Sequence, residues 1–313
     1  MKKSIPGILS VLCLLMLLFH PQLALEGARQ GLLLWGNIVL PTLLPFMICS
    51  GVIVAMDGIH ILTGPFQLIL SGFLRLSEKG SYVFMSGLLC GYPMGAKNVS
   101  DFLDSGCISP EEGAYLLAIS NHPSPMFLLG YMMSQISQIP GSGTFCSLWA
   151  VASSLYLPVI PISVLARHYY HYTKKKGSFS EHQGSAESSF SFDNHMMSSF
   201  ETMVKIGGYI MLFSILATYL RVFPLPLPPL VLPALLGAVE ITTGIQSIAQ
   251  SVSGQTGALM MIGAAAFGGL SGIFQTKSVL KNAGLSIRHY VAWKLLHSFL
   301  SCLFFYGIIC LQT

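Results

Sequence analysis

Charged residues are scarce in this sequence. Only 9% of its 313 residues are Asp, Glu, Lys or Arg, whereas 53% are hydrophobic. A soluble domain carries about 25% charged residues, and so few charges cannot cover a water-facing surface of this size. The shortage excludes an ordinary soluble protein and predicts a membrane protein whose surface contacts the lipid bilayer.

The signatures of several common activities are also missing. The sequence has no P-loop, dinucleotide-binding glycine pattern, GxSxG or HExxH motif. Its seven cysteines form no C-x-x-C pair, which argues against a zinc site or a disulfide framework. His168 and His171 have no third ligand nearby, so we expect no metal. We therefore expect a protein that is not an enzyme, needs no cofactor and binds no nucleic acid.

Long apolar runs fill most of the chain. They lie at about 4–20, 31–56, 60–74, 81–96, 111–134, 145–167, 201–222, 225–250, 255–275 and 289–311. A full span needs about 20 residues, and several runs are shorter or contain Gly and Pro. Pro41 and Pro45 predict a break in the second run. The sequence predicts an all-α polytopic membrane protein, with about eight to ten transmembrane or re-entrant helices in two inverted repeats with broken helices.

A polar stretch divides the chain. The predicted parts are a first span over 1–30, a first repeat with a connecting span over 31–172, a cytoplasmic loop over 173–200, and a second repeat over 201–313. The first span resembles a signal peptide, but no clear cleavage site follows it. Basic residues stay in the cytoplasm, which places both Lys2-Lys3 and Lys174–Lys176 there.

The two halves share an order of features. An offset of 178 residues aligns Gly91 with Gly269 and Gly106 with Gly284. If every run crosses the membrane, the aligned runs at 81–96 and 255–275 point in opposite directions. That arrangement is an inverted repeat, in which substrate binds where broken helices meet near the midplane.

Four segments carry the candidate site: residues 91–97, residues 121–125, the stretch around Glu240, and residues 268–275. In each of them a helix breaker or a polar group interrupts an apolar run, and an exposed backbone in lipid needs protein or a wet cavity to satisfy it. Tight helix packing is the alternative for the glycines, interhelical hydrogen bonding for Asn121, and an ion pair with Lys97 or Lys277 for Glu240. The predicted substrate-binding residues are Gly91, Tyr92, Pro93, Gly95, Lys97, Asn121, Ser124, Glu240, Thr242, Thr243, Gly269, Gly272 and Gln275.

Several strings resemble one known family. They are LWGNIVLPTLLPF (34–46), GYPMGAK (91–97), the turn and helix over 104–127, IGGYIMLFSIL (206–216), EITTG (240–244) and GGLSGIFQ (268–275). They are similar to YlbJ-type sporulation integral membrane proteins, of the nucleoside-recognition or Gate-domain group. That group is related to concentrative nucleoside transporters and to the membrane part of the ferrous-iron transporter.

The resemblance implies a role in spore formation. It points to transport of dipicolinate from the mother cell across the outer forespore membrane, where this multi-pass protein would lie. Lys97 and Tyr92 suit an aromatic dianion, and an intramembrane carboxylate such as Glu240 is a candidate carrier of a coupling proton or cation. Two alternatives stay open: a non-transporting scaffold for spore-envelope assembly, and a nucleoside or ion carrier.

Overall fold

The structure is a computed structural model that describes residues 4–56, 58–141, 146–173, 192–223, 226–280 and 284–312. Every regular element in these ranges is a helix. Five segments are long and apolar enough to cross a membrane: Pro21–Ala55, Leu148–Tyr169, Phe192–Val222, Gly254–Val279 and Ile287–Gln312. The predicted all-α polytopic class is confirmed.

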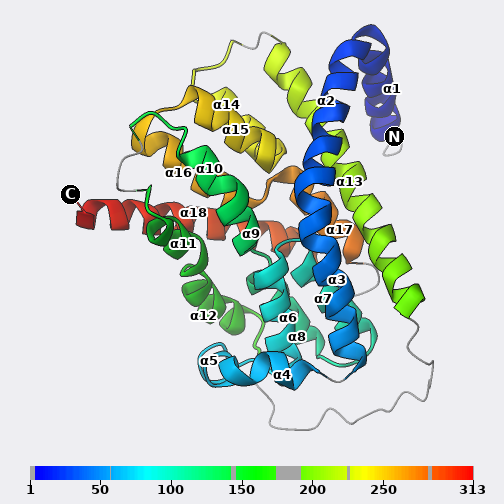
Figure 1. The fold of residues 1–313 in the computed structure, drawn as a ribbon, viewed down its shortest axis with the longest axis vertical. Helices are drawn as coiled ribbons and strands as arrows, with labels where there is room; N and C mark the ends of the chain where they lie inside the picture. Colours follow the sequence, from blue (N-terminus) through cyan, green and yellow to red (C-terminus); the bar gives the residue numbers. More distant parts are fainter. Residues whose placement is uncertain are drawn as a thin grey trace.

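Long helices line one side of the molecule (Figure 1). They are α1 (Ser4–Phe19), α2 (Pro21–Leu34), α3 (Leu40–Ala55) and α13 (Phe192–Val222). Two glycines bring α2 against α13, because a Cβ at Gly27 would lie 2.6 Å from Ile215 Cα and one at Gly31 would lie 2.7 Å from Met211 Cα. No larger residue fits at either place without moving a backbone, so small residues set this contact.

The second apolar run is continuous, contrary to the predicted break. A π-helical turn, η1 (Trp35–Val39), joins α2 to α3, and Pro45 lies inside α3. Pro41 is the second residue of α3 and directly follows the π-helical turn. The Thr42 hydroxyl donates to the carbonyl oxygens of Ile38 at 2.7 Å and Val39 at 3.1 Å, which satisfies backbone groups in the widened turn. A π-turn therefore replaces the expected break.

Short helices with interruptions fill the centre. In the first half they are α6 (Glu78–Cys90), α7 (Met94–Asp104), α8 (Pro110–Ile119), α9 (Pro125–Phe127), η3 (Leu128–Met132) and α10 (Met133–Ile136). In the second half they are α14 (Val231–Val239), α15 (Ile241–Ser251), α16 (Gly254–Phe267) and α17 (Gly269–Val279). These interruptions fall at the predicted segments around Gly91, Asn121, Glu240 and Gly268.

Helix α18 (Ile287–Gln312) crosses the molecule without a break (Figure 1). One face exposes Leu295, Phe299 and Leu303, each more than half accessible, which suits contact with lipid tails. The opposite face buries Lys294 and His297, both 2% exposed. Two ionisable side chains therefore point from an apolar helix into the bundle.

The remaining elements complete the packing. They are α4 (Ile59–Thr63), η2 (Gly64–Phe66), α5 (Gln67–Gly72), α11 (Leu148–Tyr156) and α12 (Val159–Tyr169). In Figure 1 the α4–α5 segment and the α14–α15 hairpin lie toward opposite ends of the molecule. The inverted arrangement of the two halves stays a prediction.

Two predicted boundaries differ from the helices. Helix α13 begins at Phe192, inside the stretch that composition marks as a polar loop to residue 200. There Ser199 Oγ bonds to His195 O at 3.0 Å, and residues 192–200 form the first turns of a long helix. The boundary at residue 30 falls inside α2. The basic clusters Lys2-Lys3 and Lys174–Lys176 lie outside the described residues, so the predicted topology stays a prediction.

Candidate functional site

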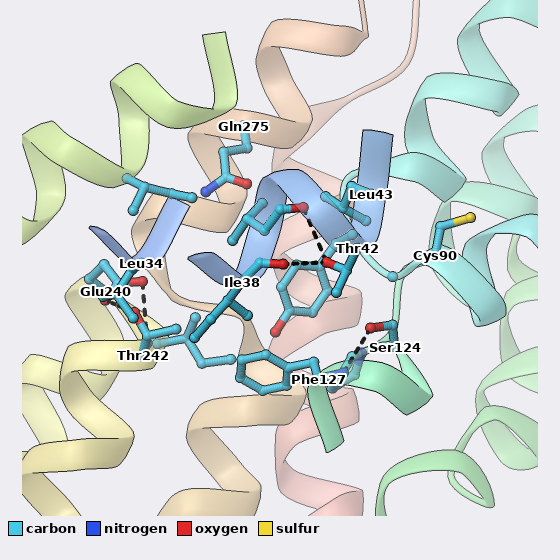
Figure 2. A pocket seen from close by; sticks show the side chains of 16 residues that line it. Leu34, Ile38, Thr42, Leu43, Cys90, Ser124, Phe127, Glu240, Thr242 and Gln275 are labelled. Atoms are coloured by element: carbon cyan, nitrogen blue, oxygen red, sulfur yellow. Dashed lines mark hydrogen bonds between the residues drawn. The ribbon is translucent and has the colours of Figure 1, made fainter. Parts of the chain in front are cut away.

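All four interrupted segments meet around one cavity of about 80 Å³ (Figure 2). Its lining combines apolar side chains with a few polar groups from different helices. Figure 2 shows Glu240 and Thr242 on one side, Ser124 and Cys90 on the other, and Gln275 above the α2–α3 segment. Most of the lining is apolar, with polar groups at Ser124, Glu240, Thr242 and Gln275. The cavity is too small for a ring-sized solute unless the surrounding helices part.

The first break, between α6 and α7, is built on glycine. Gly91 has φ +85°, and the peptide bond between Tyr92 and Pro93 is cis. A Cβ at Gly87 would lie 2.0 Å from Ser120 O, and one at Gly95 would lie 2.2 Å from the same atom. Glycines on both sides of the break therefore allow the end of α8 to approach closely.

The next break, between α8 and α9, supplies polar backbone and side-chain atoms. Asn121 Oδ1 accepts from Ala96 N at 3.0 Å, which caps the first turn of α7. The carbonyl of His122 accepts from Tyr92 N at 3.1 Å, and this hydrogen bond joins the α8–α9 break to the α6–α7 break. Ser124 Oγ accepts from Phe127 N at 3.1 Å and begins α9. Asn121 thus positions backbone, while Ser124 lines the cavity.

The break between α16 and α17 lies against the first one. Gly268 and Gly269 have φ of +85° and +69°, a conformation that glycine adopts without strain. A Cβ at Gly268 would meet the Tyr92 ring at 3.5 Å, and one at Gly272 would meet it at 3.9 Å. The Tyr92 hydroxyl donates to Ala265 O at 3.3 Å. One tyrosine therefore joins the interrupted helices of the two halves.

Glu240 begins α15 and is almost fully satisfied there. Its carboxylate accepts from Thr242 N at 3.2 Å, from Thr242 Oγ1 at 2.5 Å and from Thr243 N at 2.8 Å. The side chain is 2% exposed. Donors and the positive end of a helix both stabilise a carboxylate anion. Gly244 packs on the Cα of Gly237, which holds α14 and α15 as a tight hairpin around this residue.

A basic cluster lies behind Tyr92. Lys294 Nζ donates to Asn121 O at 3.0 Å and lies 5.3 Å from the centre of the Tyr92 ring. The rings of His122 and His297 are 5.0 Å apart in an edge-to-face arrangement. His297 Nε2 lies 2.8 Å from Leu155 O. The cluster joins α18 to the unwound segment after α8.

Sequence reasoning missed Lys294 and His297. The usable signal was an ionisable pair inside the apolar run 289–311, since charges at membrane depth are costly and mark functional sites. His122 stood in a segment already singled out, yet its partner on α18 could not be read from the sequence. The cluster is a product of tertiary packing.

A second cavity, of about 410 Å³, lies beside the first turns of α13. Lys79, Lys97, Asn98 and Asp101 contribute its charged and amide groups. Lys97 Nζ lies 2.6 Å from Asp101 Oδ2. Lys97 therefore lines a vestibule rather than the central cavity, and the expected ion pair between Lys97 and Glu240 is not formed. Lys277, the other expected partner, is exposed.

An apolar layer separates the two cavities. Leu43 and Cys90 line the central cavity, whereas Met47 and Met94 line the vestibule, and all four belong to one hydrophobic cluster. Met203 and Ile206 of α13 complete the layer. The flexible side chains of Met47, Met94 and Met203 can fill irregular gaps in this layer.

The predicted residues divide into three groups. Those at the central cavity are Gly91, Tyr92, Ser124, Glu240, Thr242 and Gln275. Those that shape the breaks around it are Pro93, Gly95, Asn121, Thr243, Gly269 and Gly272. Lys97 stands apart in the vestibule. Within the described ranges no three His, Cys, Asp or Glu side chains gather as a metal site.

Together, these features define a polytopic α-helical membrane protein in which interrupted helices surround a mainly apolar cavity with a few polar groups. No family profile matches the chain, and no solved structure matches it. The chain is 24% identical to the sporulation integral membrane protein YlbJ of Bacillus subtilis (strain 168) over 321 aligned positions. The match covers 91% of this chain and 77% of that protein. The resemblance to YlbJ-type sporulation integral membrane proteins is confirmed.

Proposed function

We propose that this protein transports a small anionic solute, and that the solute is dipicolinate, moved from the mother cell across the outer forespore membrane. One observation carries the proposal: three helix interruptions, at Gly91, Ser124 and Glu240, and Gln275 of α17 contribute to one mainly apolar cavity that contains a few polar groups. Inverted-repeat carriers bind substrate at such a place. The sporulation relative and the multi-pass fold support the setting.

Two cavities separated by an apolar layer favour transport over a scaffold. Helix packing alone requires neither buried polar groups at a central cavity nor a second cavity lined by lysines, since unpaired polar groups in a bundle cost free energy. The vestibule attracts anions through Lys79, while Lys97 is paired with Asp101, and the layer of Leu43, Met47 and Cys90 closes the central cavity behind it. Passage then requires the layer to open, which is a gating step.

The central cavity offers complementary groups for an aromatic dianion. Tyr92 and Phe127 provide ring faces, while Ser124 and Gln275 provide hydrogen-bond donors. Lys294 supplies a cation behind Tyr92. Glu240 repels an anion, so the carboxylates of the solute bind toward Ser124 and Lys294. In Figure 2 Phe127 lies between Glu240 on one side of the cavity and Ser124 on the other.

A nucleoside or another hydroxyl-bearing neutral solute is a second candidate. The observation in its favour is that Glu240 and Gln275 both line this cavity, because carboxylate and amide groups recognise hydroxyls. Uptake assays with dipicolinate and with uridine in parallel proteoliposomes separate the two. The anion proposal predicts uptake of dipicolinate, with uridine at the level of empty vesicles.

The cellular test is the dipicolinate content of spores from a strain that lacks this gene. Synthesis of dipicolinate is measured in the same cultures and must be intact. Transport predicts spores depleted of dipicolinate, with the compound retained in the mother cell or released to the medium, and recovery when the gene is restored. Normal dipicolinate in spores with a defective envelope would instead support the scaffold alternative.

A further inference from the structure

Lys294 is the least satisfied charge-bearing group in the centre of the bundle. It is 2% exposed, and its ammonium has three N–H donors. Across the described residues one of these finds an acceptor, the carbonyl oxygen of Asn121 at 3.0 Å, and no Asp or Glu lies within ion-pair distance. The face of the Tyr92 ring lies on another side. The site therefore lacks a counter-ion for a protonated lysine.

Its titratable neighbours come from several elements. They are Tyr92 before α7, His122 after α8, Tyr156 on α11, and Tyr290 and His297 on α18, with Glu240 beyond Tyr92. Of the other helices against α18, α16 has no titratable residue, and Lys277 on α17 is exposed. Arg167 on α12 bonds to Ser163 O, and buried Glu112 on α8 bonds to Ser77 N. None of these supplies Lys294 with a paired carboxylate.

His122 has one ring nitrogen without a hydrogen-bond partner among the described residues. Its Nε2 contacts the carbonyl oxygen of Ile119, and because a carbonyl can only accept, that nitrogen carries the hydrogen. In a neutral ring Nδ1 then holds a free lone pair. His122 Nδ1 is buried and has no hydrogen-bond partner among the described residues. An unpartnered basic nitrogen thus lies within the cluster that contains Lys294.

Glu240 differs from this cluster because the fold supplies its hydrogen-bond partners. Three donors hold its carboxylate at the start of α15. A group that carries a transported proton must exist in both protonation states during the cycle. An unpaired buried amine meets that requirement, because burial favours its neutral form and an incoming anion favours its charged form.

We propose that Lys294, with His122 and His297 beside it, carries the proton that couples anion transport to the pH gradient. In the absence of solute the Lys294 amine, which lies behind Tyr92, is neutral. When the anion enters, the amine nitrogen binds one proton from the aqueous side on which the cavity is open, and becomes the ammonium that pairs with the carboxylate. The anion and about one proton then leave together on the other side, and the amine returns neutral. This inference rests on the proposed anion transport and replaces Glu240 as the coupling residue.

Proton uptake upon binding tests the proposal in purified, detergent-solubilised protein. Dipicolinate is added in weakly buffered solution at about pH 7.5, where both of its carboxyl groups are ionised, and a pH-indicator dye reports protons removed from solution. We expect the parent protein to take up close to one proton per dipicolinate bound. Lys205→Gln, on the exposed side of α13, is the matched control and should behave like the parent.

Lys294→Arg separates coupling from binding, because arginine stays charged. It should bind dipicolinate with no proton uptake, and Lys294→Gln should bind it more weakly, also without uptake. Size-exclusion profiles check folding. If Lys294→Arg does not fold, the comparison of proton uptake between the parent and Lys294→Gln still tests the proposal. Binding without proton uptake in the parent, or undiminished uptake in either variant, overturns the proposal for Lys294. A parent that binds no dipicolinate at all contradicts the proposed function instead.

Discussion

Glu240 and Lys294 are both 2% exposed near the centre of the same bundle, but their surroundings are opposite. Glu240 begins a helix and receives three hydrogen bonds from residues two and three positions ahead. Lys294 lies inside an unbroken helix and donates one hydrogen bond to a distant carbonyl. A buried charge that local backbone satisfies is part of the fold, whereas one that lacks a partner is available for a ligand. The comparison assigns structure mainly to Glu240 and function mainly to Lys294.

The largest expected effect comes from Lys294→Met. Loss of the cation should lower the affinity for dipicolinate about 30-fold or more, as for other buried charge contacts. The free energy of unfolding of the protein without dipicolinate should change by less than about 1 kcal/mol, because the lost hydrogen bond to Asn121 is offset by removal of a poorly solvated amine. Titration calorimetry and a thermal melt check both parts. If Lys294→Met lost as much free energy of unfolding as free energy of binding, Lys294 would have a structural role like that of Glu240, and the proposed difference between them would be wrong.

Gly95→Ala tests the backbone frame that holds the Lys294 acceptor. Its Cβ would lie 2.2 Å from Ser120 O, next to Asn121, so either α7 or the unwound segment must shift. We expect destabilisation of about 2–3 kcal/mol together with loss of uptake. Gly208→Ala on α13 is the matched control, since nothing lies within 4 Å of the position that its added methyl group would take, and it should leave both unchanged. A tolerated Gly95→Ala would mean that the break is not tightly packed.

Glu240→Ala should mainly destabilise the fold. It removes the cap of α15 and leaves buried donors of Thr242 and Thr243 without an acceptor, at a cost of about 1–2 kcal/mol. Glu240→Gln keeps one carbonyl acceptor and should lose less. Thermal melts measure the difference. If Glu240→Gln is as stable as the parent but no longer accumulates solute, Glu240 takes part in coupling and the assignment to Lys294 alone is wrong.

The smallest effect is expected from Lys97→Gln in the vestibule. Its ion pair with Asp101 is partly exposed, and such pairs contribute about 0.3–0.5 kcal/mol. Stability should hardly change, while the initial rate of uptake falls about twofold at low salt and less at high salt, because screening weakens long-range attraction. A loss as large as that of Lys294→Met would move the substrate site to the vestibule.

The sequence predicted the class and the breaks well because their signals are local. Low charge, apolar runs and the interruptions at Gly91, Asn121, Glu240 and Gly268 need no knowledge of packing. The break predicted from Pro41 and Pro45 was wrong. A π-turn and a hydrogen bond from the Thr42 hydroxyl accommodate both prolines in a continuous helix. A proline shows where backbone groups are freed, but the surrounding structure decides how they are satisfied.

The position of Lys97 could not be predicted for a different reason. Helix α7 restarts at Met94, and Lys97, Asn98 and Asp101 follow at three, four and seven residues, which places them on one helical face toward the vestibule. A restart one residue later would turn that face elsewhere. Lys294 was missed because its acceptor, Asn121 O, is far away in sequence and belongs to backbone.

Protection of Cys90 by the solute tests the central claim most directly. This thiol lines the central cavity, whereas Cys13 lies exposed on α1 and serves as an internal control. The purified protein is treated with N-ethylmaleimide with and without saturating dipicolinate, and modification of each cysteine is followed by mass spectrometry. The account predicts that dipicolinate slows modification of Cys90 and leaves Cys13 unchanged. Modification of Cys90 at the same rate, under conditions in which dipicolinate is transported, would contradict a substrate site at the meeting point of the four breaks.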